Sequence, residues 1–494
     1  MDAWIERQRA ADARIAASAA RPDGATAIGA APSASNLWPS SPRSAYAVIL
    51  ITLIWAANYT DRQMLGLLIP PIKADLHLSD TSLGLVTGLG FVLLYSVLSV
   101  PVARVADRSN RRNILAAGLV VWSVMTCLTG LVTNVWELAT TRFLLGAAEA
   151  AAIAPSISLV GDMVSGARRP LTLSLLTTGS GLSAILFIPL VAMLAQAYGW
   201  RAAFLAAGYA GLVLAALLAL TVKEPSRGAR GAGARPSVAL AETARFLLGS
   251  RAYLFTVAGG AFAGVSLYAT QVWHPAFLAR VHHLDMAQIG WATGALRGIG
   301  SIAGAILGGV IAERLGRRDA RWRLIVPGLA CLLAWPAEAL FLMSPNLTLA
   351  LAGMFGCHLF TAMHFGPIYA VCHSVARRGM SSTATAVFIL VANVVGQVVG
   401  PLAIGLLNDR GAGLFGAEAI RYSLLVAGAS LPIAGALMML GARSLGADIG
   451  RAEPSDGATQ SLTANRPLST GSHPIASLSD RARSAMPSQM PARS

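Results

Sequence analysis

Long apolar stretches recur along the chain from Ala45 to Ala442, with only short polar interruptions between them. Each has roughly 20 residues, enough to cross a hydrocarbon core of about 30 Å as a helix. Strands are excluded as spanning elements, because a barrel would show alternating segments of about 10 residues. The sequence therefore predicts an all-α membrane protein. Its twelve expected spans lie near 45–70, 82–106, 113–134, 136–162, 171–198, 201–222, 252–279, 287–313, 323–343, 346–375, 381–408 and 418–442.

Composition agrees with a membrane protein, because 55% of the residues are apolar and only 12% are charged. About 25% charged residues is typical of a soluble domain. The net charge of +15 could suggest a nucleic-acid partner, but the arginines occur in particular loops between spans. Basic residues concentrate in cytoplasmic loops of membrane proteins, so we expect no nucleic acid, a multi-pass protein of the plasma membrane, and both termini in the cytoplasm. The expected outward loops hold only Lys73, Arg201, Arg280, Arg410 and Arg421.

The chain divides into two halves that are related by a fixed offset of 206 positions. This offset places Gly84 on Gly290, Gly88 on Gly294, and the first span on the seventh. Such an offset indicates duplication, with six spans in each half and a pseudo-two-fold axis between them. The expected organisation is a disordered cytoplasmic tail at 1–43, a first half at 44–222, a cytoplasmic linker at 223–250, a second half at 251–443 and a second disordered tail at 444–494.

A short basic loop occurs once in each half, at the same offset. The first copy runs from Ala103 to Arg112 and the second from Gly309 to Arg318. A carboxylate with several arginines at the cytoplasmic rim can form a latch whose ion pairs differ between inward-open and outward-open states. Simple anchoring of the loops by positive charge is the alternative. The expected latch residues are Asp107, Arg108, Arg111, Arg112, Glu313, Arg314, Arg317 and Arg318.

Four charged residues fall inside predicted spans of the first half: Asp61 and Arg62 in span one, and Arg142 and Glu149 in span four. Charges near the bilayer centre cost at least about 2.5–3.5 kcal/mol on insertion scales, so such residues are functional candidates. Helix geometry places Asp61 and Arg62 about 12–14 Å below the outer surface, between Arg142 at about 9 Å and Glu149 at about 20 Å, so we expect the four to meet. We expect the carboxylates to exchange protons, while the arginines neutralise them or attract an anion. A self-neutralising structural network is the alternative.

The second half does not repeat these charges, since the offset places Tyr268 opposite Arg62. Coupling is therefore expected in the first half, and substrate recognition partly in the second. Arg297, in the middle of span eight and flanked by glycines, is expected to face the cavity and to take part in coupling. Span ten contains several cysteines and histidines, but their spacing does not fit a closed metal site, so no metal is expected. The further candidates to line the cavity are Tyr268, Thr361, His364 and Asn393.

Taken together, these motifs resemble the spinster-like branch of the major facilitator superfamily. The two basic loops carry the resemblance to the superfamily. The resemblance to the branch is carried by Asn58-Tyr-x-Asp61-Arg62-x-x-Leu65, Arg142-x-x-x-Gly146-x-x-Glu149-Ala150, Tyr198-Gly-Trp200-Arg201-x-x-Phe204, and Gly400-Pro401 with Gly405 and Asp409. Spinster-like members are associated with proton-linked movement of lysolipids and sphingoid phosphates. The resemblance thus implies an amphipathic anionic substrate here. It also implies that Asp61, Arg62, Arg142 and Glu149 have the roles given above.

We expect a secondary active transporter, not an enzyme, that moves a small organic or amphipathic anion by alternating access. No phosphate-binding loop occurs in the sequence, so we expect no cofactor and a proton gradient as the driving force. The expected partners are a small or lipid-like substrate and the bilayer, and the protein is expected to be a monomer. A proton-coupled multidrug efflux pump and a non-transporting membrane sensor are the alternatives.

Overall fold

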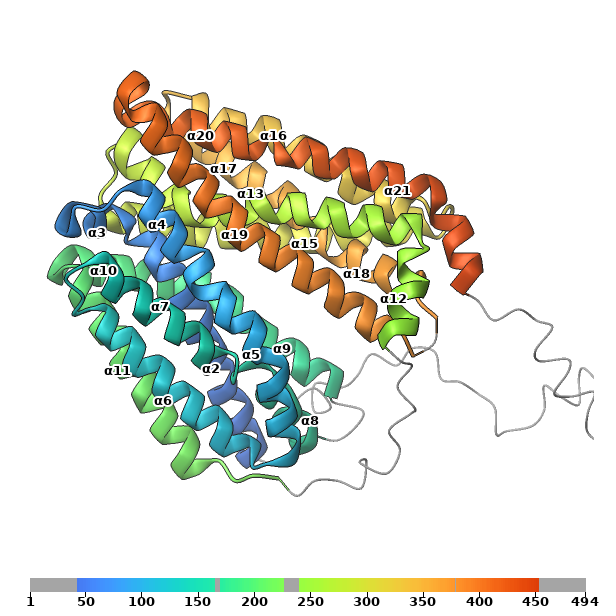
Figure 1. Cartoon of the computed structure of the whole chain (residues 1–494), viewed down its shortest axis with the longest axis horizontal. Helices are drawn as coiled ribbons and strands as arrows, with labels where there is room; N and C mark the ends of the chain where they lie inside the picture. Colours follow the sequence, from blue (N-terminus) through green and yellow to red (C-terminus); the bar gives the residue numbers. More distant parts are fainter. Residues whose placement is uncertain (1–41, 165–168, 226–239, 378, 453–494) are drawn as a thin grey trace, which may run out of the picture. The chain divides into compact units, whose positions relative to one another are not determined.

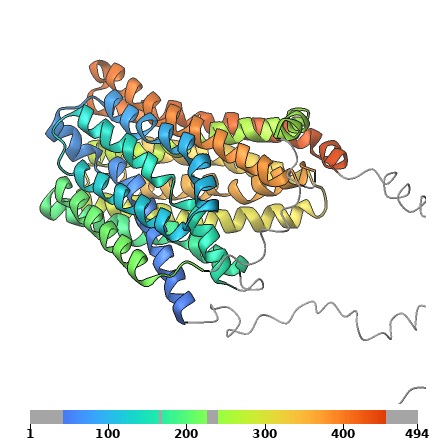
Figure 2. The same cartoon turned by 60° about the horizontal axis from the view of Figure 1, so that its bottom comes forward.

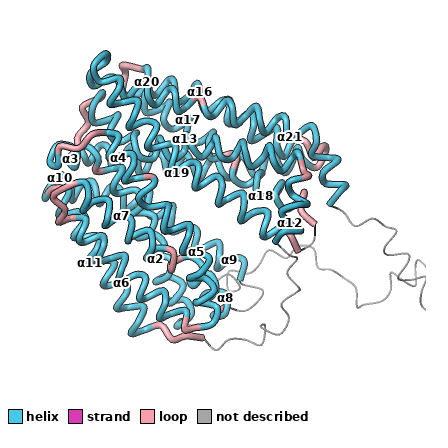
Figure 3. The backbone as a smooth tube through the Cα atoms, viewed as in Figure 1, coloured by secondary structure: helices cyan, strands magenta, loops and turns pink. Residues whose placement is uncertain are grey.

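The computed structural model describes residues 42–164, 169–225, 240–377 and 379–452. Within these ranges every regular element is a helix, and Figure 3 shows helices joined by short loops. The expectation of an all-helical protein is therefore confirmed for the described residues. Most of the two tails expected at 1–43 and 444–494 lies outside these ranges, as do residues 226–239 of the expected linker.

The first half contains six spans, several of which are divided into shorter helices. The fifth span includes a π-helical turn, and the fourth is interrupted directly after Glu149. The elements, in chain order, are α2 (Pro42–Leu67), α3 (Ile69–Leu76), α4 (Asp80–Thr87), α5 (Leu89–Arg108), α6 (Arg111–Thr129), α7 (Val135–Glu149), α8 (Ile153–Met163), α9 (Arg169–Leu182), η2 (Ser183–Phe187), α10 (Ile188–Tyr198) and α11 (Trp200–Thr221).

The second half follows the same plan, with a π-helical turn in its second span. A short helix, α12, precedes it in the segment expected to be a linker. The elements are α12 (Leu240–Leu248), α13 (Arg251–Val281), α14 (Met286–Trp291), η4 (Ala292–Leu296), α15 (Arg297–Gly316), α16 (Trp322–Met343), α17 (Leu347–Ala362), α18 (Phe365–Ser374), α19 (Ser381–Phe415), η5 (Gly416–Glu418), α20 (Ala419–Gly428) and α21 (Ser430–Ala452).

The predicted number of spans agrees with these helices. Ten stretches of the described chain are long and apolar enough to cross a membrane. The last of them, Ser381–Ala452, contains α19 as well as α20 and α21, so it holds two spans. Helix α2, with 26 residues, is the remaining one. The described part of the chain thus has twelve transmembrane spans.

The last helix is longer than the sequence suggested. Helix α21 continues to Ala452, whereas a disordered tail was expected from residue 444. Its final turns are held in place, because Leu445 is fully buried and the Asp448 carboxylate accepts hydrogen bonds from the Ser250 hydroxyl and the Ala252 amide. The last helix therefore ends later than the expected boundary at residue 443. The sequence did not reveal this, because the residues that hold the final turns lie about 200 positions away in the chain.

Helices α4 and α19 form one of the close contacts between the two halves. A Cβ atom built on Gly84 would lie 2.4 Å from the backbone oxygen of Pro401, and one on Gly405 would lie 2.3 Å from that of Asp80. Only glycine permits such an approach of two helix backbones. These glycines therefore fix how closely α4 of the first half packs against α19 of the second.

The pseudo-symmetric contact joins η4 of the second half to η2 and α10 of the first. Gly294 is the counterpart of Gly88, and a Cβ atom on it would lie 2.4 Å from the Ala184 carbonyl oxygen. Gly290 packs in the same way against Ala192. The glycines related by the offset thus have the same role in both halves: Gly84 and Gly88 in the first, and Gly290 and Gly294 in the second, allow close packing against the opposite half.

The apolar core is shared between the halves at one end of the bundle only. There, one cluster joins buried residues of both halves, such as Ile72, Phe204, Phe277 and Ile420. Toward the other end the first half has its own buried cluster and the second half has another. We call the end with the shared cluster the closed end; it holds residues 68–80, 281–286 and 409–418. The other, which holds the two basic loops, is the open end. Figures 1 and 2 show the closed end at the left.

Candidate functional site

Arg62 and Glu149 form an ion pair between α2 and α7. The Arg62 Nε donates to Glu149 Oε2 at 2.6 Å. The Glu149 side chain is fully buried, whereas that of Arg62 is 20% exposed. The guanidinium also lies over two rings of α5, 5.1 Å from the centroid of Phe91 and 4.7 Å from that of Tyr95. The buried carboxylate is therefore neutralised by a cation that still has access to open space.

Asp61 and Arg142 form a second pair, buried deeper in the first half. Trp122 Nε1 donates to Asp61 Oδ2 at 3.0 Å, and Arg142 Nη1 lies 4.0 Å from the same oxygen. Both side chains are 3% exposed. The Arg142 guanidinium also lies over the Phe204 ring, 5.2 Å from its centroid. Removing one partner of such a pair would leave an uncompensated buried charge, so the two residues depend on each other.

Glycine at position 146 lets these charged helices come together. A Cβ atom there would lie 2.2 Å from the Phe91 backbone oxygen, so α7 and α5 are in backbone contact. Arg142, Gly146 and Glu149 share one face of α7, because they are separated by four and then three residues. The structure thus brings together all four charges that the sequence singled out, in two pairs.

A central cavity of about 400 Å³ lies between the two halves, and Arg62 is in its wall. Arg297 faces it from the second half. No aspartate or glutamate is among the described residues that line it, so its wall is positively charged. The other polar or aromatic lining residues are Tyr59, Gln63, Thr87, Phe91, Ser180, Tyr268, Gln271, Ser301, His358 and Gln397.

Arg297 is half-buried at the junction of η4 and α15, and none of the ion pairs of the described chain includes it. Tyr268, which occupies the position equivalent to Arg62, lines the same cavity. Its hydroxyl donates to Asn393 Oδ1 at 3.0 Å. Asn393 is therefore positioned behind the tyrosine as its hydrogen-bond partner, one step from the cavity surface.

Thr361 and His364 are in a different place from the other predicted residues. Both are buried at the end of α17, and the His364 Nδ1 hydrogen bonds to the Thr361 backbone oxygen. Neither is among the residues that line the central cavity. His358, one turn earlier in α17, lines it instead. The sequence pattern of span ten did not separate these histidines, because its helix is apolar on nearly every face.

Asp61 faces a second cavity, of about 430 Å³, inside the first half. Apart from Asp61, its wall is mostly apolar and comes from α2, α6, η2, α10 and α11. Asp61 and Arg62 are adjacent in the chain but line different cavities, because successive side chains on a helix point about 100° apart.

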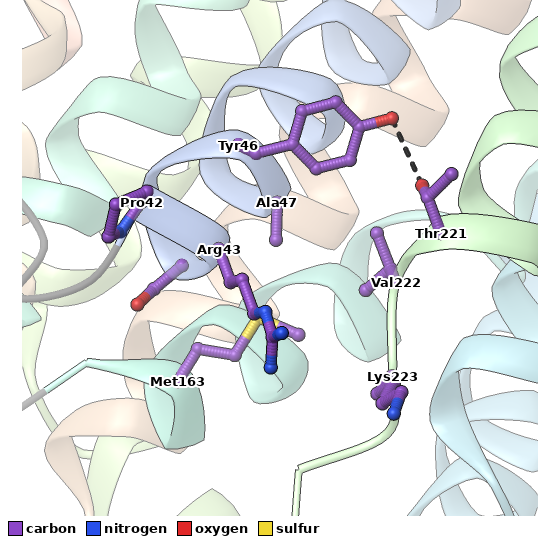
Figure 4. A pocket seen from close by; sticks show the side chains of 9 residues that line it. Pro42, Arg43, Tyr46, Ala47, Met163, Thr221, Val222 and Lys223 are labelled. Carbon is purple, nitrogen blue, oxygen red and sulfur yellow. Dashed lines mark hydrogen bonds between the residues drawn. The ribbon is translucent and has the colours of Figure 1, made fainter.

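A third hollow, of about 580 Å³, lies where α2 begins, next to α8 and the end of α11 (Figure 4). Arg43 and Lys223 line it, and the Thr221 hydroxyl donates to the Tyr46 hydroxyl at 3.0 Å. None of the buried charged residues reaches it. We therefore place the functional site at the central cavity and not here.

The rim arginines pair within their own half. Arg111 Nη1 lies 2.5 Å from Asp162 Oδ2, and its Nε lies 2.8 Å from Glu224 Oε1. Arg112 bonds to the Val222 backbone oxygen, and Arg317 pairs with Glu313 at 2.6 Å. Arg108, Arg314 and Arg318 are exposed, and the Asp107 side chain lies outside the described part of the structure.

Ionic contacts across the halves occur at the closed end, around Asp80. Its carboxylate is 1% exposed and binds both terminal nitrogens of Arg280, at 2.5 and 2.8 Å. Lys73 Nζ and Asn408 Nδ2 donate to the same carboxylate at 2.5 and 2.8 Å. The Asp409 carboxylate in turn accepts from the Asp80 and Thr81 amides. This cluster was not predicted from the sequence, although Lys73 and Arg280 are two of the few charges expected in the outward loops.

The chain matches a known protein family over most of its length. The sequence profile described as Major Facilitator Superfamily matches residues 51–401. The chain belongs to this superfamily. It is 31% identical over 400 residues to an MFS-type efflux pump of Mycolicibacterium smegmatis (strain ATCC 700084 / mc(2)155), covering 80% of this chain and 92% of that protein.

Two further matches are to spinster proteins, one in sequence and one in fold. Protein spinster homolog 3 of Danio rerio is 26% identical over 394 residues, covering 75% of this chain and 78% of that protein. A crystal structure of a bacterial homolog to the human lysosomal transporter spinster, inward-facing and unoccupied, superposes with a TM-score of 0.77 at 24% identity, covering 83% of this chain and 99% of that chain. The chain is thus a multi-pass membrane transporter, not an enzyme.

Proposed function

We propose that this major facilitator protein is a proton-coupled secondary transporter of a small organic or amphipathic anion. One observation carries the proposal: the central cavity is walled by Arg62 and Arg297, with no carboxylate among the described residues that line it. A cavity of about 400 Å³ is in the range of small-molecule sites. Guanidinium groups bind carboxylates and phosphates through charge-assisted hydrogen bonds.

Proton coupling follows from the competition for Arg62. When Glu149 is ionised, it holds the guanidinium through the 2.6 Å bond. When Glu149 takes up a proton, Arg62 loses its counter-charge and becomes free to bind an anion in the cavity. Proton binding and anion binding then favour each other, which is a coupling free energy between two sites. Asp61 is proposed as a second carboxylate that exchanges protons, with Arg142 as its counter-charge.

Alternating access is proposed to break the closed end and form the rim latch. In the described conformation the halves are joined around Asp80, and the basic loops pair within their own halves. If the basic loops are cytoplasmic, as the positive-inside rule predicts, this conformation is inward-open with both termini inside. The described chain begins and ends at this same open end (Figure 1). The proton gradient of the plasma membrane would supply the driving force without a cofactor.

The proposal is tested by flux into proteoliposomes with an imposed pH gradient, using lysophospholipids, aromatic acids and neutral sugars. We expect gradient-dependent movement of at least one anion and no movement of the sugars. Arg62→Gln should abolish it, whereas Arg245→Gln, at an exposed arginine of α12, should not. Gradient-dependent flux of sugars, or of no compound, would overturn the proposal.

Efflux of apolar compounds is a second candidate function. It is favoured by the 31% identity to an MFS-type efflux pump and by the mostly apolar cavity next to Asp61. A lipophilic cation such as ethidium discriminates between anion transport and efflux of apolar compounds, because the arginines of the central cavity should repel it. Gradient-driven ethidium efflux that depends on Asp61 and not on Arg62 would favour this second function.

A further inference from the structure

Glu338 is a fully buried carboxylate toward the C-terminal end of α16, in the half that lacks the Glu149 pair. Its Oε1 lies 2.9 Å from Nε2 of His274, which comes from α13 and is 1% exposed. An isolated carboxylate in such a place would be very costly. An added proton held by the pair would remove this cost, either as a glutamate with an imidazolium or as a glutamic acid with a neutral imidazole.

His358 connects this pair to the central cavity. Its ring lies 5.4 Å from the His274 ring, centroid to centroid, and His358 also lines the cavity beside Arg297. The Nδ1 of His274 and the Nε2 of His358 are buried and have no hydrogen-bond partner among the described residues. The three side chains thus form a line from the cavity wall to Glu338, with free ring nitrogens along it.

Few other ionisable groups lie around Glu338. The thiol of Cys357 in α17 is beside it, and Cys331 lies two turns away in α16. Trp335 and Glu338 face Gly428 of α20, and Arg421 of that helix binds the Leu342 carbonyl instead. The other ionisable residues of the helices packed on α16 are Arg297, Glu313 and Arg314 of α15, Tyr369, Cys372 and His373 of α18, Tyr422 of α20, and Arg443, Asp448 and Arg451 of α21.

We propose that Glu338, His274 and His358 form a second proton-binding site, loaded from the central cavity through His358 and independent of the Glu149–Arg62 pair. Each transfer is a simple proton exchange: a cavity proton binds a His358 ring nitrogen, His358 passes a proton to His274, and His274 passes one to Glu338. No other group is consumed. The second half, which has no counterpart of Glu149, would then bind a proton of its own.

Infrared difference spectroscopy of the purified full-length protein in nanodiscs tests this directly, with no transported substrate. Between about pH 4 and about pH 10, which spans the range documented for buried glutamates, the protein should show a carboxylic-acid band that titrates. Glu338→Gln should remove one titrating carboxyl, because glutamine keeps the hydrogen bond to His274 but cannot ionise. Glu149→Gln should leave that band in place, and so should Glu418→Gln, at an exposed carboxylate.

A second variant separates proton access from folding. His358→Phe should keep the Glu338 band but slow its response to a pH jump, since the link to the cavity is lost. An unchanged band in Glu338→Gln, or an unchanged rate in His358→Phe, would overturn the proposal. Neither result depends on transport, so this proposal can fail while the proposed function holds, and the reverse.

Discussion

The Arg62 Nε donates to Glu149 Oε2 at 2.6 Å, yet the two partners differ in access: the carboxylate is fully buried and the guanidinium is 20% exposed at the cavity wall. An anion can therefore reach the cation without displacing the protein around the carboxylate. This asymmetry distinguishes the pair from Asp61 and Arg142, both of which are buried away from the central cavity. It makes Arg62 the residue for which proton and substrate are expected to compete.

Replacing Arg297 should weaken anion binding without lowering stability. Arg297→Gln removes a half-buried cation that has no carboxylate partner, so folding loses no ion pair. A charge-assisted hydrogen bond contributes about 1.5–3 kcal/mol, so the affinity for the transported anion should fall about 10- to 100-fold. Binding can be measured by calorimetry, with Arg245→Gln as the control. A loss of affinity that is equal in both variants would contradict the assignment of Arg297 to the site.

The Asp80 cluster should hold the closed end together. Asp80→Asn removes the charge that binds Arg280 and Lys73, at an expected cost of about 1.5–3 kcal/mol to this conformation. Spin labels at the exposed positions Ala74 and Ala412 should then show an added population at longer distance. Asp75→Asn is the matched control, because Asp75 pairs with Arg201 inside the first half. Equal broadening in both variants would count against a latch at Asp80.

Gly84 should be sensitive to a single methyl group. In Gly84→Ala the new Cβ would lie 2.4 Å from the Pro401 backbone oxygen, so α4 and α19 must separate. Overpacking of this kind costs about 1–3 kcal/mol, and the melting temperature of the detergent-solubilised protein should fall. Gly309→Ala should not lower it, since a Cβ there meets nothing within 4 Å and alanine favours a helix over glycine. If both variants melted alike, the contact between α4 and α19 would not limit stability.

The features that the sequence predicted correctly are those determined by a single helix or by the offset between the two halves. Span length predicted the twelve helices, and the offset of 206 predicted that Gly84 and Gly290 occupy equivalent places. The spacing of Arg142, Gly146 and Glu149 predicted a shared helix face, and depth predicted that Asp61 and Arg62 would meet them. Each of these depends on the geometry of a regular helix crossing a bilayer of known thickness.

The remainder depends on which helix faces are turned toward one another. Glu338 was missed because its partner His274 comes from a span far away in the sequence. His358 and His364 have similar sequence surroundings, but only the first lines the cavity. The Asp80 cluster was also missed, because residues at helix ends look solvated until the opposite half is in place. Gly309 of the basic loop has no close neighbour in this conformation, which sequence alone could not show.

The central claim is that Glu149 and a bound anion compete for Arg62. Its most direct test is the affinity of purified protein for whichever anion moves in the flux assay, measured from about pH 5 to about pH 8. In the wild type the affinity should rise as the pH falls, because protonation of Glu149 frees Arg62. In Glu149→Gln it should match the low-pH value of the wild type at every pH. A Glu149→Gln variant that kept the full pH dependence of the wild type would contradict the account.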